Sequence, residues 1–186
     1  DAEILPTDIT FSGIAYPKAK VILLLGGLEV AKTNAEPNAL FSLKLSPLAP
    51  GVKVFSILAE DVEGVRSILI TLTIAIKEKT STNVANLFIP PTLSLDKLSY
   101  ARGNNITAHG YSAPGSNLIF NLDSKDEGKT VANNSGFYKL SINTDSLSLG
   151  SHGISAISQI VKNIGTKESG FSRLHSFIVS FSPARL

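Results

Sequence analysis

The stretch Ile106-Thr107-Ala108-His109-Gly110-Tyr111-Ser112-Ala113-Pro114-Gly115-Ser116-Asn117-Leu118 decides the fold, because the chain contains it twice. The first copy is Ile9-Thr10-Phe11-Ser12-Gly13-Ile14-Ala15-Tyr16-Pro17-Lys18-Ala19-Lys20-Val21. Each copy reads as a strand, a glycine, three residues, a proline, a short polar turn and a second strand. A repeat of this kind marks one supersecondary unit that is used more than once. The sequence therefore predicts two β modules in series.

The repeat extends without a gap over residues 9–45 and 106–142, at a constant shift of 97 positions. Ten of these 37 positions are identical, whereas unrelated sequences match at roughly two or three positions in such a span. The identical residues of the first copy are Ile9, Thr10, Gly13, Pro17, Ile22, Leu25, Lys32, Thr33, Ala35 and Leu43. The shared Gly and Pro positions are backbone constraints. They favour a duplication over the alternative, a chance similarity between two β-rich stretches.

Short segments of strand length alternate with turns rich in Gly, Pro and Asn along the whole chain. Leu40–Leu45 alternates apolar and polar residues, and Arg66–Ile76 shows the clearest period of two. Asp96–Asn105 is expected to be a loop and Asp123–Gly128 an acidic turn. No stretch has helical periodicity. The pattern predicts an all-β fold of antiparallel β-sandwiches, with a small barrel as the alternative architecture.

The expected domain boundaries follow from composition. Residues 1–78 form the first sandwich, residues 79–91 a linker, and residues 92–186 the second sandwich. Lys77–Asn86 is polar and is interpreted as the linker between the domains. Pro90-Pro91 stiffens the end of this linker and is expected to set the angle between the modules, because two prolines hold an extended backbone.

The composition excludes several classes of protein. The 186 residues contain no Cys, so disulfides and thiolate metal sites are excluded. A net charge of +2 with scattered Lys and Arg is too small for a nucleic-acid interface, which needs a clustered basic face. No apolar run has the length of a membrane span. The chain contains no Met either, which indicates a processed mature form or an excised piece.

Three places in the chain resemble the tandem bacterial immunoglobulin-like (Big-type) modules of extracellular and cell-surface proteins. The first is the strand-Gly-xxx-Pro opening at Gly13/Pro17 and Gly110/Pro114. The second is the run from Asn134 to Ile142, and the third is the hairpin from Ala59 to Ser67. The second module departs from the pattern at the third place, where Gln159–Ser169 lacks the acidic residue. The resemblance implies two tandem immunoglobulin-like β-sandwich domains in an extracellular spacer, adhesin segment or appendage, and it implies no catalytic residue.

The two modules differ in the segment that precedes the repeat. Leu87–Ser99 precedes the second copy, whereas only Asp1–Asp8 precedes the first, so the opening strand of the first module is expected to be short or missing. A sandwich that lacks a strand exposes backbone donors and acceptors at an edge. Either the short lead-in suffices, or upstream sequence was removed, or a strand of another subunit fills the edge. Head-to-tail repetition of that last contact would build a filament.

Candidate site residues are few, and the sequence assigns no catalytic, cofactor-binding or metal-binding residue. His109, His152 and His175 have no metal-ligand spacing, and only His109 and His152 could meet. Two acidic clusters offer oxygen ligands for Ca²⁺ but match no known loop; they are Glu60, Asp61 and Glu63 in one turn and Asp123, Asp126 and Glu127 in another. Solvated turns are the favoured interpretation of both clusters.

The remaining candidates concern sugars and catalysis. Four tyrosines are candidates for a sugar-stacking platform, namely Tyr16, Tyr100, Tyr111 and Tyr138. Tyr138 is expected in the core, and the absence of Trp weighs against a carbohydrate-binding module. Asn105-Ile106-Thr107 and Asn133-Asn134-Ser135 match the glycosylation sequon. No nucleophile motif or acid-base pair is present, so an enzyme is not expected. The expected role is a structural or adhesive surface module that self-associates or joins neighbouring domains, with glycan binding or a spacer as the alternative.

Overall fold

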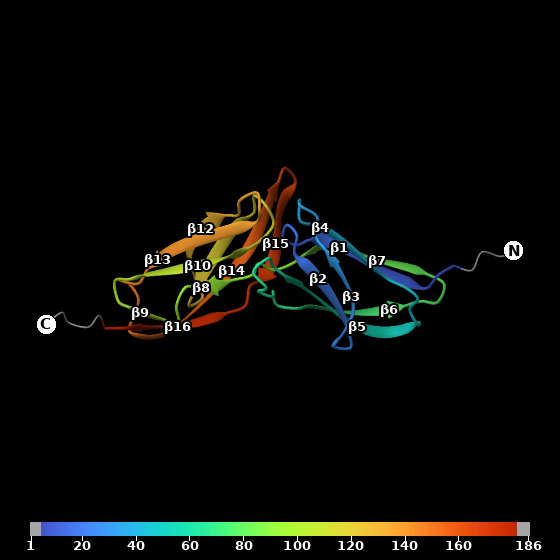
Figure 1. The fold of residues 1–186 in the computed structure, drawn as a ribbon, viewed down its shortest axis with the longest axis horizontal. Helices are drawn as coiled ribbons and strands as arrows, with labels where there is room; N and C mark the ends of the chain where they lie inside the picture. Colours follow the sequence, from blue (N-terminus) through green and yellow to red (C-terminus); the bar gives the residue numbers. More distant parts are fainter. Residues whose placement is uncertain (1–4, 182–186) are drawn as a thin grey trace. The chain divides into compact units, whose positions relative to one another are not determined.

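The computed structural model describes residues 5–181, and this part of the chain consists of β-strands joined by turns and loops (Figure 1). The chain divides into two compact units, with the boundary between Ile89 and Pro90. Each unit is described by itself. The strands of unit 1 are β1 (Asp8–Ile14), β2 (Lys20–Leu25), β3 (Leu28–Asn34), β4 (Leu40–Leu45), β5 (Gly51–Glu60), β6 (Ile70–Ile76) and β7 (Ser81–Phe88).

Unit 1 is a β-sandwich of two sheets, ordered β4-β1-β7 and β3-β2-β5-β6. The predicted alternation of β4 is confirmed, since Phe41 and Leu43 are buried whereas Ser42 and Lys44 are exposed. Phe11 of β1 packs edge-on against Phe55 of the other sheet, with 5.2 Å between ring centroids. The core therefore lies between the two sheets, as expected for a sandwich rather than a barrel.

Unit 2 has the strands β8 (Ser94–Leu95), β9 (Ser99–Ala101), β10 (Asn105–Tyr111), β11 (Asn117–Leu122), β12 (Lys125–Val131), β13 (Phe137–Asn143), β14 (Gly150–Lys162), β15 (Gly165–Phe171) and β16 (His175–Ser180). One sheet has the order β13-β10-β8 and the other β12-β11-β14-β16-β9, with β15 also paired to β14. Phe120 and Tyr138 meet across the core at 5.8 Å. This strand order is that of the immunoglobulin fold, so the expected all-β, immunoglobulin-like sandwich is confirmed.

Equivalent strands of the two units pair in equivalent registers. Ile9 lies opposite Leu45, and Ile106 lies opposite Ile142, at the same shift of 97 positions. The hairpin turns also correspond, because Gly26-Gly27 and Asp123-Ser124 each place two consecutive residues at positive φ. Such two-residue turns match the right-handed twist of the strands that they join. Gly26-Gly27 therefore forms a tight hairpin turn between β2 and β3.

The prediction that residues 79–91 form a linker is wrong, because most of this segment is strand β7. β7 pairs with β1 in parallel, from Asp8 opposite Ser81 to Ile14 opposite Phe88. Its composition is misleading for a physical reason. An edge strand covers the core with only one face, so its other positions are free to be polar, and a bulge at Ala85–Asn86, where Asn86 has φ 61°, interrupts the period of two.

The expectation of an open edge at the start of unit 1 also needs correction, because β7 lies at that position. Residues 5–7 of the lead-in carry no strand, and residues 1–4 lie outside the described residues. The position beside β1 is nevertheless filled, because β7 of the same chain lies there. The position beside β1, where a strand of another subunit was considered, is therefore occupied by the chain itself.

Three smaller expectations also need correction. The strand expected over Arg66–Ile76 begins only at Ile70, because residues 67–69 leave the sheet after one isolated bridge at Arg66. The loop expected over Asp96–Asn105 contains β9. The acidic turn expected over Asp123–Gly128 is two residues long, and Asp126 already lies in β12. In each case the partner strand decides where pairing starts, and local composition does not reveal the partner.

Candidate functional site

The most distinctive arrangement in unit 1 is the pairing of its first strand with its last. β1 and β7 run in parallel, and their paired residues span nearly the whole of both strands. The chain enters β1 at Asp8 and leaves β7 at Phe88, which lie at opposite ends of the ladder. A pull on the chain at both sides of the unit therefore acts along the two strands in opposite directions. All bonds of the ladder share that load, because parallel pairing spaces them evenly.

The beginning of this ladder is fixed by a buried carboxylate. Asp8 is 1% exposed, and its Oδ2 lies 2.7 Å from Nζ of Lys44 on β4. The hydrogen bond from Lys44 lowers the pKa of Asp8, burial opposes this effect, and a further hydrogen bond from Ser81 lowers it again. Asp8 N also donates to the Thr80 carbonyl at 3.3 Å. One side chain thus connects β1 to both of its neighbours at the point where the chain enters.

The other end of the ladder depends on the glycine of the repeated motif. A Cβ on Gly13 would overlap the carbonyl oxygen of Leu87 in β7, and a Cβ on Gly110 would overlap that of Thr92. The two glycines therefore allow the neighbouring segment to approach β1 and β10 closely. Ile89 N then donates to the Ile14 carbonyl at 2.9 Å, which extends the bonding to the boundary of the unit. The shared glycine has the same packing role in both units.

Unit 2 also pairs a strand near its start in parallel with its last strand. Residues 99–101 of β9 lie opposite residues 178–180 of β16. Ile178 N donates to the Leu98 carbonyl at 2.9 Å, and Arg102 N donates to that of Ser180 at 2.9 Å. Tyr100 of β9 is buried, and its hydroxyl donates to Asp96 at 2.6 Å. Burial and this carboxylate raise the pKa of Tyr100, so the phenol stays neutral and keeps its donor.

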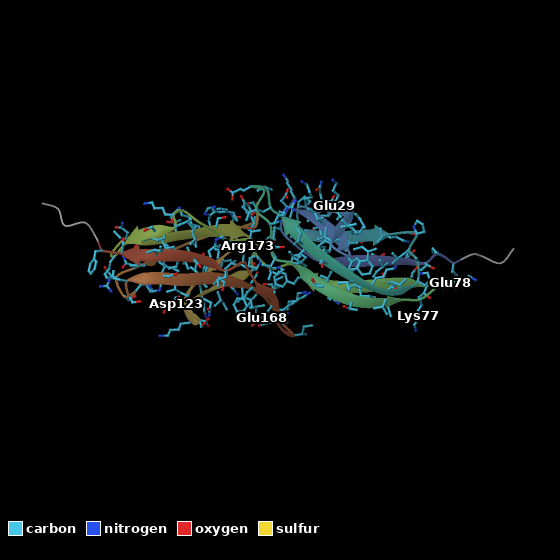
Figure 2. The ribbon with its side chains drawn as sticks, turned by 90° about the horizontal axis from the view of Figure 1, so that it is seen from below. Glu29, Lys77, Glu78, Asp123, Glu168 and Arg173 are labelled. Atoms are coloured by element: carbon cyan, nitrogen blue, oxygen red, sulfur yellow. The ribbon has the colours of Figure 1, made fainter. Side chains whose placement is uncertain are left out.

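His152 forms the clearest electrostatic site of unit 2. Its Nδ1 lies 2.6 Å from Oδ2 of Asp123, its Nε2 lies 2.8 Å from the Ser148 carbonyl, and its ring stacks on Phe177. A carbonyl only accepts hydrogen bonds, so Nε2 carries a proton and the imidazolium satisfies both contacts. The hydrogen bond to Asp123 raises the pKa of His152. Asp123, labelled in Figure 2, comes from the β11–β12 turn and also accepts from Gly153 N at 2.9 Å.

The structure does not bring together the other residues that were considered as metal ligands. His109 is on β10 and His152 on β14, in different sheets. His175 on β16 has a pKa that burial lowers. Within residues 5–181, no three His, Asp or Glu side chains form a group that could hold a metal ion. Asp61 instead closes its own turn, since its Oδ1 accepts from the backbone N of Glu63 and Val65, at 2.9 Å each.

The four tyrosines considered as a sugar-stacking platform differ in how far they are buried. Tyr16, Tyr100 and Tyr138 are core residues, as expected for Tyr138. Tyr111 is half-buried on the outer face of β10, where its ring meets that of Phe137 at 5.6 Å. His109 lies 6.2 Å from the same Phe137 ring. Sequence reasoning did not include Phe137, although its position directly across from Tyr111 could have indicated the contact.

The first asparagine of each glycosylation sequon accepts hydrogen bonds from other residues of the chain. Asn105 begins β10, and its Oδ1 accepts from Asn143 Nδ2 at 2.9 Å. Asn133 closes a turn, because its Oδ1 accepts from the backbone N of Ser135 and of Phe137, at 3.0 Å each. Both side-chain amides thus contribute to local structure in the described chain.

No protein-family model matches the sequence, and no curated protein sequence matches it. Solved structures of similar fold include the fibronectin(III)-like modules of Clostridium thermocellum CbhA, which are 19% identical to this chain. That similarity covers 100% of this chain and 94% of that chain, with a TM-score of 0.33. The D00-D0 domain of intimin has 16% identity over 85% of this chain and 78% of its own, with a TM-score of 0.33. A putative membrane anchored protein from Corynebacterium diphtheriae has 13% identity and a TM-score of 0.41, and the similarity covers 94% of this chain and 48% of that chain. At these values the similarities carry no argument about function. Within the described residues no helix has the length and hydropathy that crossing a membrane requires.

Proposed function

We propose that this chain is a load-bearing structural module of an extracellular or cell-surface protein, used as a spacer or adhesive segment. The observation that supports the proposal is the parallel β1–β7 ladder, which joins the two ends of unit 1 side by side. The extracellular location rests on the resemblance of the repeated Gly and Pro motif to surface modules. The proposal contains no chemical reaction.

The ladder resists extension for a geometric reason. When two strands are pulled apart from one end, their hydrogen bonds break one at a time. When the pull acts along parallel strands from opposite ends, the bonds must break together. In unit 1 the second arrangement applies, and Asp8 with its Lys44 partner connects the loaded end to a third strand. In unit 2 the β9–β16 pair has the same polarity over only three paired residues.

Single-molecule force spectroscopy of the full chain tests the proposal, with one variant that breaks the ladder and one that leaves it intact. Because Asp8 N donates to the Thr80 carbonyl, the register directs the N–H groups of Thr82 and Val84 toward β1. Val84→Pro removes a bond of the ladder, whereas Asn83→Pro removes an N–H on the outer side, which an edge strand tolerates.

We expect two unfolding events in the wild-type chain, each releasing about 30 nm of chain at about 3.5 Å per residue. Val84→Pro should clearly lower the force of one event, and Asn83→Pro should leave both near the wild-type force. If Val84→Pro and wild type unfold at equal force while both are folded, the ladder does not carry the load and the proposal is wrong.

A second candidate function is glycan binding by unit 2. The half-buried rings of Tyr111 and Phe137 lie together on the outer face of the β10 sheet, and unit 1 has Ile14 and Leu40 at the equivalent positions. Aromatic rings are the side chains on which sugars stack. A glycan array with wild type and Tyr111→Ala would test this function, and a wild-type chain that binds no glycan would eliminate it.

A further inference from the structure

β6 is the outermost strand of its sheet, and its outer backbone groups point away from the sheet. Gly26 N donates to the Val54 carbonyl at 3.0 Å, so Val54 directs its backbone groups toward β2 and not toward β6. Thr73 lies opposite Val54, and its N–H and C=O therefore face outward. The same holds for Thr71 and Ala75 by alternation. Within residues 5–181, β5 is the one strand that pairs with β6.

The core beneath β6 is incompletely covered at this edge. Ile70, Leu72 and Ile74 point toward the core but are only half-buried. In unit 2 the equivalent strand β16 is covered by β9, and Phe177, which corresponds in register to Ile74, is 1% exposed. A further strand beside β6 would therefore complete the sheet and bury apolar surface, as β9 does in unit 2.

The edge also lacks the features by which proteins normally prevent strands from associating. Such edges carry charged residues, proline or a bulge, whereas Ile70–Ile76 is Ile-Thr-Leu-Thr-Ile-Ala-Ile in a regular ladder. Charge resumes only beyond the strand, at Lys77 and Glu78 (Figure 2). The uncharged surface continues onto β5, where Val52 is 73% and Val54 47% exposed.

We propose that β6 pairs antiparallel with β6 of a second copy of this chain, about a two-fold axis at Thr73. This register is self-complementary. Ile70 lies opposite the partner's Ile76, and Leu72 lies opposite the partner's Ile74, so apolar residues meet on the core face and Thr73 meets the partner's Thr73 on the outer face. Lys77 lies opposite the partner's Leu69, so no like charges face each other. The two-fold axis makes the contact closed.

This dimer goes beyond the proposed mechanical role, which a monomer fulfils equally well. It also differs from the head-to-tail addition considered as one alternative from the sequence, since it uses the opposite sheet and joins the copies side by side. Residues 71, 73 and 75 of each copy would exchange two backbone hydrogen bonds with the residue opposite.

Sedimentation velocity of the full chain, over a wide concentration range, tests the proposal. We expect a reversible rise from the monomer mass of 19.7 kDa to twice that mass. Thr73→Pro removes only an outward N–H, so it should fold, and the symmetric loss of two central bonds should weaken the dimer about thirtyfold. Thr73→Lys places two positive charges opposite each other and should weaken it as well. Thr73→Val is the matched control and should dimerise like wild type.

Circular dichroism establishes that each variant is folded, and Thr73→Lys decides the outcome if Thr73→Pro does not fold. A wild-type chain that stays monomeric at the highest soluble concentration would overturn the proposal. A dimer that Thr73→Pro and Thr73→Lys leave unchanged would overturn it too, because the contact would then lie elsewhere. Either result leaves the mechanical proposal intact, since that proposal is tested by unfolding force.

Discussion

Gly13 shows how one residue of the repeated motif controls the packing of a strand. Its position within a strand, near the end of β1, is unfavourable for glycine on conformational grounds. The position has no room for a side chain, because Leu87 of β7 occupies that space. Gly110 has the same role beside Thr92. The repeat in the sequence indicated that these glycines matter, and the structure gives the close approach as the reason.

Gly13→Ala should destabilise unit 1 by about 1–3 kcal/mol, because the new methyl group must displace the β7 backbone. Ser12→Ala, at the neighbouring half-buried position, should change the unfolding free energy by less than about 0.5 kcal/mol. Urea unfolding of both variants measures the difference. Equal stability of the two variants would show that β7 moves away without cost.

His152 gives the stability of unit 2 a defined dependence on pH. The hydrogen bond to Asp123 holds the pKa of His152 in the folded chain above the ordinary value of an imidazole. A raised pKa contributes stability that is full below the unfolded pKa and is lost as the pH rises through the folded pKa. His175 acts in the opposite sense, because its folded pKa is lowered. A comparison of variants at His152 removes the effect of His175.

At pH 6, His152→Gln should be less stable than wild type by about 1–3 kcal/mol, through the loss of hydrogen bonds made by a charged group. The difference should shrink as the pH is raised above 6.5 and through the folded pKa. Thermal or urea unfolding across this range measures it. A difference that does not change with pH would mean that the pKa of His152 is the same in the folded and the unfolded chain.

Among the elements, β7 shows why a local sequence pattern can fail to predict a strand. Thr82 and Val84 alternate as a strand requires, but exposed Asn83, Ala85 and Asn86 give the segment the composition of a linker. β4 was predictable, because both its alternation and its boundaries are visible in the sequence. β9 was not, because three residues do not establish a period.

Removal of β7 should abolish the fold of unit 1. A fragment of residues 1–89 should fold, whereas a fragment of residues 1–78 should lose cooperative unfolding, because it lacks the cover that buried Phe88 and Ile89 provide. Circular dichroism during thermal unfolding distinguishes the two fragments. If the shorter fragment unfolds as cooperatively as the longer one, β7 is dispensable and the original linker interpretation would be correct.

At the scale of the whole molecule, each unit has the parts that an independent domain needs. Unit 2 has its own core, built from both of its sheets around residues such as Phe120, Tyr138 and Phe177. Units of roughly 90 residues bury enough surface to fold alone, with modest stability. The chain therefore carries two cores rather than one.

Fragments of residues 1–89 and 90–186 should both fold separately. Their amide NMR spectra should superimpose on that of the full chain except for residues near Ile89 and Pro90. A fragment of residues 90–186 whose spectrum shows the poor dispersion of an unfolded chain would mean that unit 2 depends on unit 1.

The sequence alone determined that this protein is all-β, that the pattern of residues 9–45 recurs over residues 106–142, and where strands such as β4 lie. These properties are local, because alternation, glycine and proline act within a few residues of themselves. The tertiary structure decided which strands are neighbours. It placed β7 beside β1, joined His152 to Asp123, and left β6 at an edge. Such contacts depend on residues far apart in the chain, and one half-polar strand does not specify its partner until the core has formed.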